Sequence, residues 1–212
     1  ITTLANITKS DKLIVFGDGK NDIDMFQMAD ESYAVANAHE ELKRYATGEI
    51  LSNDEDGVTK WLKAKVTRYK DMTEKEKAAA GYLYNPNYDK ELLGEIGKCN
   101  DLCHEFNQIK PSDRGAQTEI LKKIFGKMGE CVTVNTPFWC DYGYNTTVGN
   151  YFFANHGCQI LDGGKVTFGD YVFIAPNCIF TTAEHALDAE QRNEGLEVAL
   201  PITIGNNVWI GA

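Results

Sequence analysis

The stretch TVGNYFFANHGCQILDGGKVTFGDYVFIAPNCIF, residues 147–180, repeats with a period of six. Apolar residues open successive hexads, with one slip of two residues, at Val148, Ala154, Ile160, Phe168, Ile174 and Phe180. A helix would place apolar residues three or four apart, and a half-buried strand would place them two apart. A period of six fits a short strand plus a corner, and three such units make one triangular turn of a parallel β-solenoid. The pattern returns at Ile204 and Ile210, so the solenoid is expected to continue to the end of the sequence.

The composition is that of an ordinary globular protein, and it restricts the partners. The chain has 212 residues, of which 43% are hydrophobic and 25% charged, and its net charge is −10 at pH 7. This charge argues against a nucleic acid or an anionic membrane surface as the main partner, because both would repel it. The sequence has no apolar run of about 18 residues and no secretory leader, so it predicts a cytoplasmic protein.

Six cysteines lie between residues 99 and 178, at Cys99, Cys103, Cys131, Cys140, Cys158 and Cys178. Six cysteines could form disulfides or bind a metal ion. The spacing contains no CxxC pair and no paired histidines, which are the usual marks of a metal site. We therefore interpret the cysteines as reduced thiols that pack as small apolar side chains.

Strand and helix patterns alternate in the first part of the chain. Short apolar stretches at 13–17 and 33–36 predict strands, and the stretches 21–29 and 39–46 predict helices. Such alternation is typical of an α/β layer. We therefore expect a partial α/β fragment over residues 1–65.

A helical cap and the solenoid are expected to make up the rest. After a linker at 66–72, Thr73 with Glu76 three residues later has the form of a helix capping box. An apolar helical face follows, with steps of four, three, four and three residues, at Leu92, Ile96, Cys99, Cys103 and Phe106. We expect the helical cap over residues 73–130 and the β-solenoid over residues 131–212, so that the whole chain is mainly β.

The end of the first predicted strand carries the acidic turn Gly17-Asp18-Gly19-Lys20-Asn21-Asp22-Ile23-Asp24-Met25-Phe26. Carboxylates there could hold Mg²⁺, which prefers oxygen ligands, although a turn with surface acids is an equal alternative. Together with 33–38 and 53–58, the turn resembles the last motif of haloacid-dehalogenase-like (HAD-like) phosphatases of the Cof type. The resemblance covers residues 1–65 and implies that Asp18 and Asp22 help to hold the metal. The nucleophilic aspartate of that family lies upstream of this motif, so we expect the tail of a phosphatase that is inactive by itself.

From Met72 onward the sequence resembles the maltose and galactoside O-acetyltransferases, which are hexapeptide-repeat acyltransferases. The matching strings are Met72-Thr73-Glu74-Lys75-Glu76-Lys77, Phe106-Asn107, Pro137-Phe138-Trp139-Cys140-Asp141-Tyr142-Gly143, Phe153-Ala154-Asn155, Ile160-Leu161-Asp162, Ile174-Ala175-Pro176-Asn177 and PITIGNNVWIG at 201–211. The resemblance implies a left-handed parallel β-helix, acetyl-CoA as co-substrate and a homotrimer with its active site between subunits. The family continues beyond Ala212, so we expect a C-terminal truncation; a natural fusion and a fragment are both open explanations for the two-part chain.

A sugar hydroxyl that attacks an acetyl thioester must lose its proton, and histidine suits that task near neutral pH. His185 lies where the hexads break into a polar excursion that runs to Leu200, and the resemblance identifies it as the catalytic base. His156 is the other candidate for the base, and we expect it instead to line the substrate site or to lie on the surface. Glu197 is expected to orient the His185 ring, with a solvated loop acid as the alternative.

The resemblance also assigns residues to the two substrates. It implies that Asp141, Asn155 and Asp162 contact the acceptor sugar; an asparagine ladder and a corner acid are the structural alternatives for the last two. Trp209 is expected to line the channel for coenzyme A, with a buried solenoid corner as the alternative. The backbone N–H of Ala212 falls where the family donates to the thioester oxygen.

These patterns together predict a sugar O-acetyltransferase that uses His185 as general base. A Mg²⁺-dependent, Cof-like sugar-phosphate phosphatase that lacks its nucleophile is the alternative, and a solenoid scaffold without catalysis is a third reading. Tyr84 is followed by Asn85-Pro86-Asn87, a departure from the family pattern that leaves the acceptor sugar open.

Overall fold

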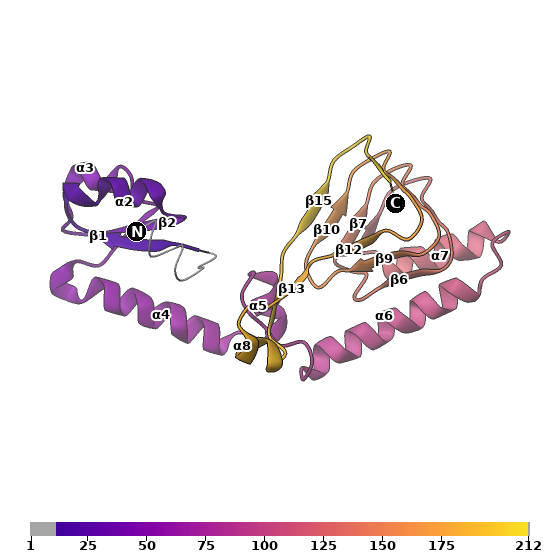
Figure 1. The fold of residues 1–212 in the computed structure, drawn as a ribbon, viewed down its shortest axis with the longest axis horizontal. Coiled ribbons are helices and arrows are strands. Elements are labelled where there is room, and N and C mark those ends of the chain that lie inside the picture. The colour runs from indigo at the N-terminus through magenta and orange to yellow at the C-terminus, as the bar shows by residue number, and fades with distance from the viewer. Residues whose placement is uncertain (1–11, 212) are drawn as a thin grey trace. The chain divides into compact units, whose positions relative to one another are not determined.

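The computed structural model describes residues 12–211, and the chain divides into two compact units, Ile1–Asp71 and Met72–Ala212. Each unit is described by itself (Figure 1). Over residues 12–211, none of the helices combines the length and the apolar character that crossing a membrane requires.

The first unit is an α/β segment with a small parallel sheet in the order β1-β2-β3. Its elements are β1 (Ile14–Gly17), η1 (Lys20–Asp22), α2 (Ile23–Met28), β2 (Glu31–Val35), α3 (Glu40–Lys43), β3 (Gly48–Ile50), η2 (Asn53–Glu55) and α4 (Gly57–Asp71). Ala34, Val35 and Leu42 are fully buried between sheet and helices. The predicted alternation of strands and helices is confirmed, and the charged stretch 66–71 continues the helix α4.

Three helices open the second unit: α5 (Glu74–Ala79), α6 (Lys90–Gln108) and α7 (Arg114–Ile124). The predicted capping box is confirmed, because the hydroxyl of Thr73 accepts from the Glu76 N–H and the Glu76 carboxylate accepts from the Thr73 N–H. The predicted apolar face of α6 is buried against the β-sheets at Leu92, Cys99, Cys103 and Phe106.

Short parallel strands form three stacked sheets in the orders β15-β10-β7-β4, β16-β11-β8-β5 and β12-β9-β6. Their bounds are β4 (Lys127–Met128), β5 (Thr133–Val134), β6 (Phe138–Cys140), β7 (Thr146–Val148), β8 (Phe153–Ala154), β9 (Cys158–Leu161), β10 (Val166–Phe168), β11 (Phe173–Ile174), β12 (Ile179–Thr181), β15 (Ile202–Ile204) and β16 (Trp209–Ile210). All pairings in these sheets are parallel, which confirms a parallel β-helix of the hexapeptide-repeat kind (Figure 1). The first strand starts at Lys127, a few residues before the predicted start at Cys131.

The register explains the sequence period. Phe153 pairs with Phe173, so one coil takes 20 residues, which is three hexads plus two residues. The two extra residues lie in the corner between β9 and β10, where the sequence slips. Every residue that opens a hexad from Val148 to Phe180 is buried in one core with the apolar face of α6.

One excursion interrupts the coils between β12 and β15. It consists of β13 (Ala183–His185), α8 (Ala189–Asn193) and β14 (Glu197–Ala199), and the two strands pair antiparallel. Because the excursion leaves and rejoins the coil at neighbouring points, β15 still pairs with β10 in the regular parallel register. The hairpin therefore presents polar side chains without disturbing the stack.

We expect Gly149→Ala to destabilise the second unit. Gly129, Gly149 and Gly169 lie at one corner where successive coils touch through their backbones, and a Cβ on Gly149 would lie 2.5 Å from the carbonyl carbon of Gly169. The crowding should lower the free energy of unfolding by about 1–3 kcal/mol, measured by urea denaturation. Gly97→Ala in α6 is the control, because its Cβ meets nothing within 4 Å and should add about 0.5–1 kcal/mol. Equal stability of the two variants would contradict this view of the corner.

Candidate active site

Three polar residues lie together at the carboxyl ends of the strands in the sheet β12-β9-β6. Asp141 follows β6, Asp162 follows β9, and Thr182 follows β12. The hairpin β13–β14 begins at the same corner. The stacked coils therefore bring residues from distant parts of the sequence to one place.

His185 and Glu197 face each other across the hairpin. They are directly paired in its register, and His185 Nδ1 lies 3.7 Å from Glu197 Oε2. The His185 side chain is 63% exposed, whereas that of Glu197 is only 12% exposed. The separation is longer than a hydrogen bond, and contacts of this kind are often long before a substrate binds. This geometry gives an accessible imidazole with a carboxylate beside one of its nitrogens.

Tyr84, a residue that the sequence analysis did not assign to the site, holds Glu197 in place. The two residues exchange both backbone hydrogen bonds, from Tyr84 N to Glu197 O (2.9 Å) and from Glu197 N to Tyr84 O (3.1 Å). The Tyr84 hydroxyl also donates to Glu197 Oε1 at 2.6 Å. Burial and the adjacent carboxylate raise the pKa of Tyr84, so its hydroxyl keeps the donated proton. A tyrosine before a polar, proline-containing turn was the available signal, but sequence spacing does not reveal a contact across 113 residues.

The turn after Tyr84 has a structural task. Asn85 Nδ2 donates to the Glu194 carbonyl at 2.7 Å, and Asn87 Nδ2 donates to the Gly195 carbonyl at 3.1 Å. Both carbonyls belong to the loop between α8 and β14. The segment 85–87 thus holds the loop that leads into Glu197 through two side-chain hydrogen bonds.

Asp162 is fully buried, and its carboxylate is occupied by the protein. Oδ1 accepts from the N–H groups of Tyr142 (2.8 Å) and Gly143 (3.1 Å), while Oδ2 accepts from the Thr146 hydroxyl (2.9 Å). Burial raises its pKa, and these hydrogen bonds partly oppose that effect. The geometry favours the corner-acid alternative over contact with a sugar.

Asp141 is partly buried close to the other acids of the corner. Burial, followed by the negative charges of Asp162 and Glu197, raises the pKa of Asp141 to about 6. A carboxyl group with this pKa can bind or release a proton near neutral pH. Asp141 therefore belongs to the same electrostatic environment as the His185–Glu197 pair.

Asn155 lies at the other end of the same sheet, in the corner between β8 and β9. Its Oδ1 accepts from the His156 N–H at 2.8 Å and from Asn135 Nδ2 at 3.5 Å, which is the ladder considered in the sequence analysis. His156 is exposed there and contacts the carbonyl of Thr136 through Nδ1. One chain therefore does not bring Asn155 and His156 beside His185.

Of the two residues expected on the cofactor side, the structure describes only Trp209. It lies on β16 and is 76% exposed, so it does not occupy a buried corner. Ala212 lies outside the described residues.

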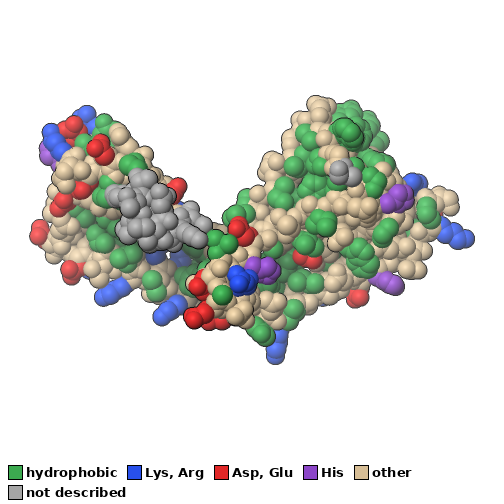
Figure 2. All heavy atoms as spheres, in the orientation of Figure 1, with side chains coloured by type: hydrophobic (Ala, Val, Ile, Leu, Met, Phe, Trp, Pro, Cys, Tyr) green, Lys and Arg blue, Asp and Glu red, His purple; other side chains and the backbone are tan. Residues whose placement is uncertain are grey.

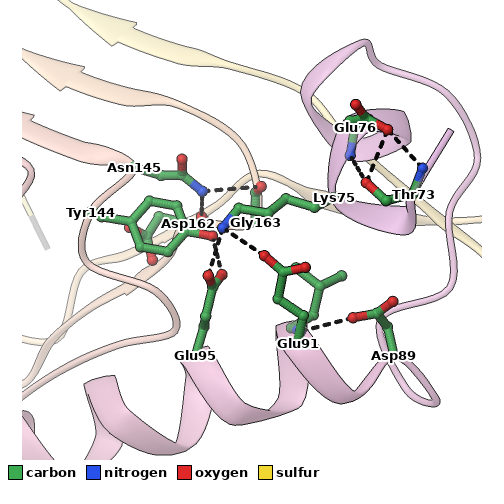
Figure 3. A network of polar contacts seen from close by, with 11 residues as sticks. Thr73, Lys75, Glu76, Asp89, Glu91, Glu95, Tyr144, Asn145, Asp162 and Gly163 are labelled. Atoms are coloured by element: carbon green, nitrogen blue, oxygen red, sulfur yellow. Dashed lines mark hydrogen bonds and ion pairs between the residues drawn. The ribbon is translucent and has the colours of Figure 1, made fainter.

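A cavity of about 200 Å³ lies behind the hairpin, lined by Lys75, Tyr84, Tyr142, Tyr144, Lys165 and Ala199 among others. Four of its lining residues, Lys75, Tyr144, Asn145 and Gly163, belong to a polar network (Figure 3). Tyr144 and Lys75 both bond to the Glu95 carboxylate, at 2.7 Å and 2.5 Å. Asn145 Nδ2 donates to the Asp162 carbonyl at 2.8 Å. The network joins the cap helices to the β-helix at the base of the hairpin.

In the first unit, Asp18 and Asp22 lie at the end of β1. Asp22 Oδ2 accepts from the N–H groups of Asp18 (3.1 Å) and Gly19 (3.2 Å), and Asn53 Nδ2 donates to Asp18 Oδ2 at 3.0 Å. The turn therefore places two oriented carboxylates at the C-terminal edge of the parallel sheet.

Comparison with known families matches each unit separately. Residues 2–62 match the haloacid dehalogenase-like hydrolases, and residues 77–129 match the maltose acetyltransferase hexapeptide capping motif. The chain is 44% identical over 136 residues to an inferred acetyltransferase of Saccharomyces cerevisiae, covering 64% of this chain and 69% of the relative. It is 49% identical over 140 residues to one of Staphylococcus haemolyticus, covering 66% and 73%.

Solved structures of acetyltransferases are also similar to this chain. A maltose O-acetyltransferase from Clostridium difficile is 43% identical with a TM-score of 0.65, over 66% of this chain and 75% of that one. A galactoside acetyltransferase in complex with coenzyme A is 36% identical with a TM-score of 0.64, over 67% and 70%. The chain belongs to the hexapeptide-repeat acetyltransferase family that includes these acetyl-CoA-dependent enzymes, and a HAD-like hydrolase segment precedes its acetyltransferase part.

We expect Asp141→Asn to stabilise the protein above about pH 6. Because the pKa of Asp141 is about 6 in the folded protein and about 3.9 in an unfolded chain, ionising it costs folding free energy as pH rises between these values. The variant removes this cost and should gain about 1–2 kcal/mol in free energy of unfolding at pH 7.5 but little at pH 4. Denaturant unfolding from pH 4 to pH 8 measures the difference.

Asp101→Asn, in the exposed part of α6, is the control for replacing an acid. A stability difference between Asp141→Asn and the parent that is the same at both ends of the pH range would refute the raised pKa.

Proposed function

We propose that the second unit transfers the acetyl group of acetyl-CoA to a sugar hydroxyl, with His185 as general base. The observation that carries the proposal is the exposed imidazole of His185 paired with the sheltered carboxylate of Glu197. The family membership supplies the reaction class, and the C. difficile and galactoside enzymes are named for sugar acceptors. We assign this activity to a cap over 73–130 and a left-handed β-helix over 131–212.

The chemistry needs one proton relay. Acetyl-CoA supplies the acetyl group as a thioester. His185 accepts the proton of the sugar hydroxyl as its oxygen forms a bond to the carbonyl carbon, and Glu197 stabilises the imidazolium that results. His185 then returns the proton to the sulfur as the carbon–sulfur bond breaks. Tyr84 keeps Glu197 in position throughout, because its hydroxyl occupies the other carboxylate oxygen.

We further propose that the site is completed between subunits of a homotrimer. Asn155 is remote from His185 within one chain, so its contact with the acceptor would come from a neighbouring copy, whereas Asp141 would act from the same chain. Large aromatic side chains are exposed on the sheet β16-β11-β8-β5, with Phe173 and Trp209 in direct register. Figure 2 shows groups of hydrophobic side chains among polar ones on the visible face of the β-helix. Exposed aromatic side chains in register are typical of a surface that a partner covers. We place the coenzyme A arm at Trp209.

For the first unit we propose metal binding but no reaction. Mg²⁺ is commonly held by one or two carboxylates and completed by water or phosphate, and the oriented pair Asp18 and Asp22 fits that requirement. We propose these two residues as its ligands in a HAD-like segment over 1–65, with 66–72 as connection. No phosphate transfer is assigned to this segment.

We expect His185→Ala to lower kcat/KM for acetyl transfer by about a hundredfold to ten-thousandfold, because the general base is lost. Release of coenzyme A thiol with maltose, glucose and galactosides as acceptors measures the rate. His156→Ala, an exposed histidine at the opposite end of the sheet, is the matched control for loss of an imidazole. Unchanged transfer by His185→Ala would remove His185 as the base, and phosphate release with Mg²⁺ but no acetyl transfer would favour the hydrolase alternative.

We expect Tyr84→Phe to lower kcat about tenfold with little change in KM, since the Glu197 carboxylate loses its charge-assisted hydrogen bond. The pH profile of kcat should shift as well, because a displaced carboxylate stabilises the imidazolium less. Tyr142→Phe removes a phenol from the same cavity and is the control, because among the described residues the hydrogen bond to Glu197 comes from Tyr84 and none comes from Tyr142. If both variants kept the parental pH profile, Tyr84 would be a packing residue only.

A further inference from the structure

Three buried thiols converge where the cap meets the β-helix. Cys99 and Cys103 lie one turn apart on α6, and Cys140 ends β6. The Sγ atom of Cys140 lies 3.4 Å from that of Cys99 and 3.7 Å from that of Cys103, and all three atoms lie within 4.8 Å of one another. The three residues are at most 3% exposed. Elements separated in sequence thus place three sulfur atoms in one small triangle.

The triangle has the dimensions of a coordination site. Bonds of about 2.3 Å from one metal to three sulfurs in a plane would separate the sulfur atoms by about 4 Å. The observed separations need only small shifts to reach that value. Among residues 12–211, no further His, Cys, Asp or Glu joins the cluster within 4.8 Å, so the protein offers three soft ligands and no fourth.

The thiols also contact one another directly. Cys140 Sγ lies within hydrogen-bonding distance of both Cys99 Sγ and Cys103 Sγ, so the three sulfur atoms are already gathered inside the core. The remaining polar contact is from Cys99 Sγ to the Cys140 carbonyl at 3.5 Å. Cys158, equally buried in the same β-helix, lacks this arrangement, and burial raises its pKa to about 12.

We propose that Cys99, Cys103 and Cys140 form a three-sulfur binding site for one soft monovalent cation of the Cu(I) type. Thiolates select soft ions, and a three-coordinate sulfur set suits such an ion better than zinc, which is almost always four-coordinate in structural sites. Each thiol that ligates the ion releases its proton to solvent. Cys140 adjoins Asp141, but among the described residues no hydrogen bond joins the three thiols to His185 or Glu197, and copper retention is measured without acetyl transfer.

Because the three sulfur atoms are buried, the ion cannot reach them from solvent in the fully folded protein. The sulfur atoms face the core, so the ion enters while α6 is docking on β6 or during a local opening of that contact. Once bound, it joins α6 to β6 and stabilises the docked cap.

The test uses the full chain with Cys131→Ser and Cys178→Ser, which removes the exposed and half-exposed thiols. This parent is refolded without oxygen in the presence of Cu(I) held by a competing chelator, and copper per chain is measured after desalting. We expect one copper per chain, three sulfur neighbours by X-ray absorption, and a higher Tm than the metal-free protein. Added Cys103→Ala should reduce retained copper to the blank, whereas Cys158→Ala, matched in burial, should retain it.

Equal retention by Cys103→Ala and Cys158→Ala would overturn the site, as would an empty parent protein. Tighter binding of Zn²⁺ than of Cu(I) would overturn the assignment to a soft monovalent ion. If circular dichroism shows that Cys103→Ala does not fold, Cys140→Ala takes its place. Fewer than three sulfur neighbours in the parent refutes the proposal whichever variant folds.

Discussion

The pairing of each coil with the next at a spacing of 20 residues is the constraint on which the second unit depends. The period fixes which side chains enter the core, because the residues that open each hexad all point inward. The period also determines which residues meet at each corner between successive coils. At one corner, glycine backbones touch across successive coils, and at another the buried Asp162 carboxylate ties Tyr142, Gly143 and Thr146 together. The corner that holds Asp162 is the one from which the hairpin β13–β14 emerges.

The hairpin itself is positioned from outside the repeat. Its backbone is paired within the excursion, but the residue that fixes Glu197 is Tyr84 of the cap, through two backbone hydrogen bonds and one from its hydroxyl. Asn85 and Asn87 hold the adjoining loop from the same segment. An antiparallel pair of three-residue strands alone is marginal in water, so these cross-connections supply the rigidity that an aligned imidazole and carboxylate require.

Much of this arrangement could be predicted from the sequence. The hexad period predicted the stacked parallel strands, and the break in the period predicted a polar excursion with His185 and Glu197 in it. Two features of the structure could not be predicted, because they depend on contacts between residues far apart in the sequence. The contact of Tyr84 with Glu197 joins a loop residue to a strand 113 residues away, and the two segments share no sequence pattern. The convergence of Cys99, Cys103 and Cys140 depends on how a helix docks on a strand. Asp162 illustrates a third case, since the same residue type serves as corner acid or sugar ligand, and burial favours the first.

The contact of Tyr84 with Glu197 makes the geometry of the hairpin depend on the folding of the cap. A β-helix whose amino-terminal helices had not docked would still present an imidazole, but its carboxylate partner would be unsupported and free to rotate. In the proposed acetyl transfer, activity would therefore depend on the docking of the cap as well as on the coils that carry the imidazole.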